Sequence, residues 1–135
     1  MLSTVQKVWV TIAAIFYTFA GILHFLKPAM YVKIVPPYVP WHLAIVYLSG
    51  AAEVLGGIGL LIPRVRRGAA WGLVALLIAV FPANIYMATN PIDAGAGSLP
   101  SAALWGRPLL QPIFIWWVLW CTKPALTRVS PRATI

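Results

Sequence analysis

The chain has 135 residues, of which 61% are hydrophobic and only 9% are charged. Soluble domains carry roughly 25% charged residues, so this composition excludes an ordinary water-soluble domain and predicts a surface that faces lipid. The formal net charge of +8 does not indicate nucleic-acid binding, because the basic residues lie at the ends of apolar runs and form no stripe. The single cysteine, Cys121, excludes an intramolecular disulfide and a cysteine-based metal cage.

The first apolar run covers residues 8–26 and follows Lys7. Because about 20 helical residues cross the hydrocarbon of a bilayer, the run predicts a membrane span. A secretory signal is the less favoured alternative, since no clear small-residue cleavage site follows. Residues 27–41 then contain four prolines, two tyrosines and one tryptophan. They predict a proline-rich interfacial loop, with a short helix over residues 29–34.

Three further apolar runs follow, over residues 42–62, 68–89 and 102–121. A short basic turn joins the second run to the third, and a glycine-rich loop joins the third to the fourth. Arg107, Pro108 and Pro112 predict an irregular start or a kink in the fourth helix. The sequence therefore predicts an all-α fold: one membrane domain over residues 1–135, built as an antiparallel four-helix transmembrane bundle.

The basic residues predict the orientation of this bundle. Four spans place both termini on one side of the membrane. That side has seven basic residues and the other has three: Lys7, Arg64, Arg66, Arg67, Lys123, Arg128 and Arg132 against Lys27, Lys33 and Arg107. By the positive-inside rule, we expect a multi-pass protein of the cell inner membrane with both termini in the cytoplasm.

Small residues recur along the predicted helices. The second helix has a patch that includes Gly50 and Gly57, and the third begins with the pair Gly68-x-x-x-Gly72. Helices in lipid associate through close backbone contact at small residues. We expect these glycines to serve helix packing.

Glu53 is the most informative residue of the chain. It lies near the middle of the second span, where an ionised carboxylate is costly. Ser49 and Gly50 precede it by one turn and leave room for another helix or a ligand. One interpretation is a neutral carboxyl bonded to a neighbouring helix. The other is a functional group that faces a hydrated cavity.

Four other polar residues are predicted to lie in the outer half of the membrane, with Glu53 near the inner limit of that half: His24, Asn84, Arg107 and Gln111. His24 suits either an interfacial hydrogen bond or proton transfer, and Asn84 suits either a pocket or the repair of backbone bonds freed by Pro82. Arg107 suits headgroup contact or a bridge toward Glu53. Together they predict an outward-opening pocket with Glu53 and His24 as catalytic candidates, and with the following ligand-binding candidates: Tyr17, Ser49, Asn84, Arg107 and Gln111.

Four sequence strings resemble the DoxX-like membrane proteins. They are AGILHFLKP at residues 20–28, SGAAEVLGG at 49–57, LIPR at 61–64 and VFPAN at 80–84. The likeness spans roughly residues 10–90. The resemblance implies a four-helix membrane bundle, in some relatives linked to sulfur oxidation and quinone reduction and in others to the assembly of other proteins. His24, Glu53 and Asn84 match the motif and carry over as candidate site residues.

Three functions follow as hypotheses. The first is a redox-associated protein that binds a quinone or another lipophilic molecule, with Glu53 and His24 as proton carriers and no cofactor required. The second is a non-enzymatic accessory or assembly subunit that docks another membrane protein or a second copy. The third is a small proton-coupled exporter, which the position of Glu53 in the second helix disfavours. No metal site is expected, and whether the protein is an enzyme stays open.

Overall fold

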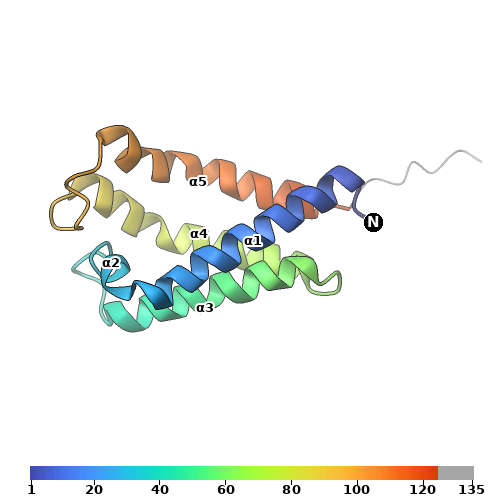
Figure 1. Ribbon diagram of the computed structural model, residues 1–135, viewed down its shortest axis with the longest axis horizontal. Coiled ribbons are helices and arrows are strands. Elements are labelled where there is room, and N and C mark those ends of the chain that lie inside the picture. Colours follow the sequence, from blue (N-terminus) through green and yellow to red (C-terminus); the bar gives the residue numbers. More distant parts are fainter. Residues whose placement is uncertain (125–135) are drawn as a thin grey trace, which may run out of the picture.

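The computed structural model describes residues 1–124, which form five α-helices and contain no strand (Figure 1). In chain order these are α1 (Thr4–Leu26), α2 (Pro28–Val32), α3 (His42–Leu61), α4 (Arg66–Thr89) and α5 (Ser101–Thr122). The prediction of an all-α fold is confirmed. Arg128 and Arg132, which contribute to the predicted charge bias, lie outside the described residues.

Three of the helices, α1, α3 and α4, are long and apolar enough to cross a membrane, with lengths of 20 to 24 residues. Helix α5 has 22 residues but is not among them, because it contains Arg107, Gln111 and several tryptophans. Large apolar side chains cover the outside of the helices; Phe19, for example, is 61% exposed. A continuous apolar exterior of this kind suits lipid as the surrounding medium.

The four long helices pack side by side, and α2 lies across one end (Figure 1). Helix α1 contacts α3 and α5, and α4 contacts α3 and α5. The start of α1 lies beside the end of α5, because the Gln6 side-chain amide donates to the carbonyls of Trp120 (3.1 Å) and Lys123 (2.8 Å). We call the half of the molecule that contains the start of α1 and the end of α5 the terminal half.

Helix α1 begins four residues before the predicted run. Ser3 and Gln6 form a reciprocal capping box, in which each side chain bonds the backbone N–H of the other. Such a box satisfies two of the otherwise unpaired amides of a helix start. The apolar pattern misses this first turn because three of its four residues, Thr4, Gln6 and Lys7, are polar.

Glycines bring α1 and α3 into backbone contact. A Cβ atom added to Gly21 would lie 2.6 Å from the carbonyl oxygen of Gly50, and one added to Gly57 would lie 2.8 Å from the amide of Thr18. Two helices without the hydrophobic effect between them gain their attraction from such close approach. Gly68 and Gly72 do not take part: nothing lies within 4 Å of the Cβ position of either residue. The expectation that this pair packs against another helix of the chain is wrong, because it lies on the outward face of α4.

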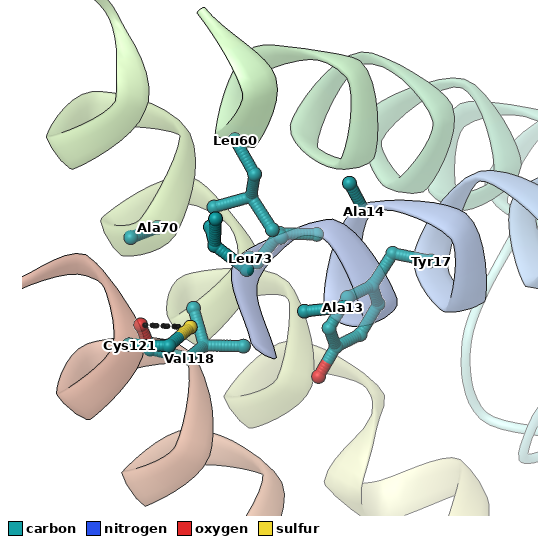
Figure 2. Close-up of a cluster of buried hydrophobic side chains, with 9 residues drawn as sticks. Ala13, Ala14, Tyr17, Leu60, Ala70, Leu73, Val118 and Cys121 are labelled. Carbon is teal, nitrogen blue, oxygen red and sulfur yellow. Dashed lines mark hydrogen bonds between the residues drawn. The ribbon is translucent and has the colours of Figure 1, made fainter. Parts of the chain in front are cut away.

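Buried apolar side chains fill the terminal half (Figure 2). All four long helices contribute, and the cluster consists of Val10, Ala13, Ala14, Tyr17, Leu60, Ala70, Leu73, Val118 and Cys121. A second, smaller cluster ties the α4–α5 loop to the end of α4 and to Ile34. This second cluster closes the other end of the molecule.

The prolines of the spans leave the helices continuous. Helix α4 is helical through Pro82, and α5 is helical from Ser101 through Pro108 and Pro112. Of the two predicted alternatives for the fourth helix, the irregular start is therefore wrong, and the kink stays a prediction. Each proline removes one backbone donor, so a carbonyl one turn earlier loses its usual helical partner.

Candidate functional site

A cavity of about 520 Å³ lies in the half of the molecule away from the termini, which we call the cavity half. Every helix contributes to its wall. All seven residues singled out from the sequence line it: Tyr17, His24, Ser49, Glu53, Asn84, Arg107 and Gln111. The structure thus gathers in one place residues that the sequence grouped by estimated depth alone.

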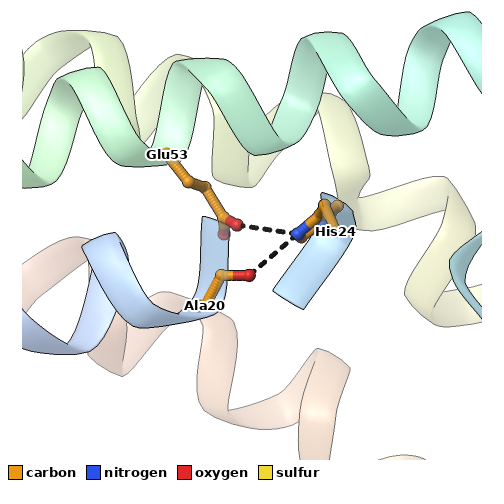
Figure 3. Close-up of polar contacts among 3 residues, drawn as sticks. All are labelled: Ala20, His24 and Glu53. Carbon is orange, nitrogen blue, oxygen red and sulfur yellow. Dashed lines mark hydrogen bonds and ion pairs between the residues drawn. The ribbon is translucent and has the colours of Figure 1, made fainter. Parts of the chain in front are cut away.

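Glu53 and His24 form a pair at the cavity wall (Figure 3). The Glu53 Oε2 atom lies 3.3 Å from Nδ1 of His24, and the two side chains are 17% and 12% exposed. The same nitrogen lies 2.9 Å from the carbonyl oxygen of Ala20. Because a carbonyl oxygen only accepts, Nδ1 carries a hydrogen and donates to it, with the carboxylate as a second acceptor nearby. The other ring nitrogen, Nε2, is left to bind or release a proton.

Close helix packing positions this pair. A Cβ atom added to Gly50 would lie 2.6 Å from Cβ of His24, so the absence of a side chain at Gly50 lets α3 approach α1 there. Glu53 follows Gly50 by one helical turn and therefore points along the same face, toward the histidine ring. The spacing Gly50-x-x-Glu53 thus serves the placement of the carboxyl as well as packing.

Tyr31 of α2 covers the histidine from the other side. Its ring stacks on His24 with centroids 3.9 Å apart and an interplanar angle of 19°. Burial, and secondly the nearby carboxyl of Glu53, raise the pKa of the Tyr31 phenol above its ordinary value. From the sequence, this tyrosine was only one of the aromatic residues of the predicted interfacial loop. No signal in the sequence linked it to His24.

The Tyr17 hydroxyl is buried among the cavity residues and has no hydrogen-bond partner. Oε2 of Glu53 is also buried and forms no regular hydrogen bond; its polar neighbour is His24 Nδ1 at 3.3 Å. A buried polar atom left without a partner costs about 1–3 kcal/mol. Packing alone therefore does not explain the Tyr17 hydroxyl at this cavity.

Asn84 and Gln111 serve a structural role as well as lining the cavity. The Asn84 side-chain amide donates to Oε1 of Gln111 over 3.1 Å, and the Gln111 amide donates to the carbonyl of Leu77. This chain of bonds ties α4 to α5 close to Pro82. Gln111, and not Asn84, is therefore the side chain that reaches a backbone carbonyl near the proline.

Arg107 does not pair with Glu53. Its side chain is exposed, and its Nη1 atom lies 3.7 Å from the sulfur of Met87. It still lines the cavity, so it lies at the edge of the space with its charge available to a bound group.

Aliphatic side chains form most of the remaining wall, and two phenylalanines stack within it. Phe16 of α1 and Phe114 of α5 line the cavity and stack with centroids 5.6 Å apart and an angle of 17°. Trp117 packs against both rings from outside the cavity, and Trp116 is 61% exposed and stacks on Trp120. Sequence reasoning missed Phe16 and Phe114, because an apolar residue in an apolar run carries no sign of the face it occupies.

The cavity has the size and lining of a small-molecule site. Such sites enclose about 300–1,000 Å³ and combine apolar walls with a few polar groups. The polar groups here are an acid, an imidazole, two amides, a guanidinium and the hydroxyls of Ser49 and three tyrosines. Within residues 1–124, no three His, Cys, Asp or Glu side chains gather in a way that could hold a metal ion. The arrangement can bind a largely apolar molecule and exchange a proton with it.

The chain belongs to a family described as a domain of unknown function, DUF8561, whose model matches residues 13–122. The matched region includes every residue that lines the cavity. No curated protein and no solved structure matches the chain.

Proposed function

We propose that the protein is an antiparallel four-helix transmembrane bundle of the cell inner membrane, with both termini in the cytoplasm. Three helices are long and apolar enough to cross a bilayer, and α5 has a matching length and packs between α1 and α4. The terminal half carries five basic residues of the described chain: Lys7, Arg64, Arg66, Arg67 and Lys123. The opposite end carries fewer, which supports cytoplasmic termini.

Within this bundle, the cavity binds a quinone or a similar lipophilic ring. The observation that carries the proposal is the carboxyl–imidazole pair of Glu53 and His24, held at the wall of an apolar cavity of about 520 Å³. The stacked rings of Phe16 and Phe114 offer an aromatic surface to a planar ligand. The resemblance to DoxX-like proteins points to the same ligand class.

The pair then acts as a proton carrier for the ligand. Reduction of a quinone to a quinol takes up two electrons and two protons. In this scheme a redox partner protein supplies the electrons, and protons reach the ring oxygens from Glu53 and His24. The pair is suited to this step because an acid and an imidazole in contact can pass a proton between them.

Direct binding measurements test the proposal. The purified chain in lipid nanodiscs is titrated with a short-chain quinone, and calorimetry follows binding. We expect Glu53→Gln to weaken binding by about 10-fold or more, because a hydrogen bond to a charged group contributes about 1.5–3 kcal/mol. Asp93→Asn is the matched control, since Asp93 is the other acid of the chain and is exposed in the α4–α5 loop. Equal affinity in both variants would exclude Glu53 from the site.

A second variant tests the cavity without changing its charges. Ala83 lines the cavity and is half-buried, so Ala83→Phe places a ring in the space and leaves the Glu53–His24 pair intact. We expect this change to abolish quinone binding while the helix content by circular dichroism stays unchanged. Retained binding would place the ligand elsewhere.

A second candidate function is an accessory subunit that docks another membrane protein. Gly68 and Gly72 of α4 and Gly106 of α5 have nothing within 4 Å of their Cβ positions, and outward-facing small residues favour contact with a further helix. Crosslinking in native membranes tests it. A partner that is lost in Gly72→Leu, with the melting temperature retained, would favour this function, and the absence of any crosslinked partner would count against it.

A further inference from the structure

A second groove lies at the terminal half, between the first turns of α4 and the last turn of α5. Its volume is about 280 Å³. It is lined by Arg67, Ala70, Trp71, Leu119, Thr122, Lys123 and Pro124. Figure 1 shows that these helix ends meet at the same end of the molecule as the start of α1. The groove is separate from the cavity around Glu53, and the two share no lining residue.

The rim of the groove is positively charged and lacks a compensating acid. Both Arg67, in the first turn of α4, and Lys123, directly after the end of α5, are exposed there. The two acids of the chain lie elsewhere, because Glu53 lines the cavity and Asp93 belongs to the α4–α5 loop at the opposite end. The first turn of α4 also has no capping side chain, so the positive end of its dipole adds to the local field.

Arg66 differs from its neighbour Arg67. Its guanidinium is held by the end of α3, where Nε donates to the carbonyl of Leu60 over 2.6 Å and Nη2 donates to that of Leu61 over 3.4 Å. Arg66 therefore has a structural role, as a cap of α3. Within residues 1–124, the side chains of Arg67 and Lys123 make no such hydrogen bond, although both border the groove.

Below the charged rim, the walls are apolar. Ala70 is buried, Leu119 is half-buried and Trp71 is 58% exposed, so an indole ring borders the groove where lipid would meet headgroups. Charge at the rim and apolar surface beneath it fit a molecule with an anionic head and a hydrocarbon tail. We propose that this groove binds one anionic phospholipid, with its phosphate between Arg67 and Lys123 and the start of an acyl chain against Trp71 and Leu119.

This inference requires only that the chain lies in a membrane and does not depend on the ligand of the cavity. The purified full chain in neutral detergent is titrated with phosphatidylglycerol, and native mass spectrometry measures the bound lipid. We expect the double change Arg67→Gln with Lys123→Gln to raise the Kd about 30-fold, because each basic residue near a headgroup contributes about a factor of 5. The matched control is Lys7→Gln with Arg64→Gln, which removes two exposed charges from the same end outside the groove.

Three further measurements distinguish an anionic lipid from a neutral lipid and from a free anion. Phosphatidylcholine with the same acyl chains should bind far more weakly than phosphatidylglycerol. Inorganic phosphate at equal ionic strength should not displace the lipid, since it lacks the tail. Trp71→Ala should weaken lipid binding although both charges remain.

The outcomes that overturn the proposal are specific. An equal loss in the control variant would mean that overall positive charge, and not the groove, attracts the lipid. Equal binding of phosphatidylcholine would remove the role of the headgroup charge, and displacement by phosphate would indicate a free-anion site. Unchanged lipid binding in Trp71→Ala would remove the role of the apolar wall.

Discussion

The terminal half and the cavity half of the molecule are built from the same four long helices but differ in how the helices meet. In the terminal half, the helices pack closely around side chains such as Leu60, Leu73 and Val118, none of which is more than 1% exposed. In the cavity half, the helices enclose about 520 Å³ with the Glu53–His24 pair at the wall. The difference arises around α4, because α1 and α3 stay in backbone contact through both halves at Gly50 and Gly57.

The comparison separates two uses of polar residues in an apolar chain. Asn84 and Gln111 bond to each other and to a backbone carbonyl, and so they hold α4 against α5. The Tyr17 hydroxyl is buried without a hydrogen bond, and the Glu53 carboxyl has only His24 beside its buried oxygen, at 3.3 Å. Asn84 and Gln111 contribute to stability, whereas the unpaired Tyr17 hydroxyl adds a cost that packing does not explain.

The largest expected effect comes from breaking the contact that the two halves share. Gly57→Leu would place its Cβ atom 2.8 Å from the Thr18 amide and 2.9 Å from the Ala14 carbonyl, and backbone cannot yield as a side chain can. We expect a loss of about 3 kcal/mol or more in the free energy of unfolding, measured by denaturant unfolding in detergent. Gly72→Leu is the control, because nothing lies within 4 Å of that position. A similar loss in both variants would contradict the role of close approach.

The next prediction compares the loss of stability from a leucine truncation in each half, with both leucines on α4. Leu73 is 1% exposed in the terminal half, whereas Leu76 lines the cavity. Leu73→Ala creates a new void and should cost about 2 kcal/mol. Leu76→Ala only enlarges an existing space and should cost less than about 1 kcal/mol. Equal losses by denaturant unfolding would mean that the cavity half is as closely packed as the terminal half.

A third variant tests whether the bonds of Asn84 and Gln111 stabilise the contact between α4 and α5. Gln111→Leu leaves the Asn84 amide without its partner and removes the side-chain bond to the Leu77 carbonyl, so we expect a loss of about 1–2 kcal/mol. Adding Asn84→Leu should recover part of that loss, since one unsatisfied buried group is removed with its partner. A double-mutant cycle measures the coupling. Strict additivity of the two changes would show that the bond contributes nothing.

Much of the fold could be predicted from the sequence, because three of the long helices coincide with apolar runs that are long enough to cross a membrane. Helix α3 begins at His42 and α4 ends at Thr89, at the residues where the apolar runs predict these limits. The candidate residues could also be found, because a residue such as Glu53 is costly within an apolar run and so stands out. Their convergence on one cavity is a property of the structure, and their roles stay predictions.

The remaining features could not be predicted, because they depend on which face of a helix a residue occupies. Gly50 and Gly72 look alike in the sequence, yet one contacts His24 and the other contacts nothing. The contact of Phe16 with Phe114 joins residues from the first and last helices. In an apolar chain both faces of a helix are apolar, so periodicity does not separate inward from outward positions.

The smallest expected effect concerns the roof of the cavity half. Tyr31 lies in α2, outside the four long helices, and its ring stacks on His24. Burial raises the pKa of its phenol above the ordinary value of 10. The protonated phenol is therefore favoured in the folded state, so its contribution to stability is complete below pH 10 and is lost as the pH rises through the folded pKa. In Tyr31→Phe this part of the pH dependence should disappear. Comparing the melting temperatures of the two proteins from pH 8 to about 11 isolates the contribution, and identical pH profiles would mean that the tyrosine is as solvated in the folded chain as in the unfolded one.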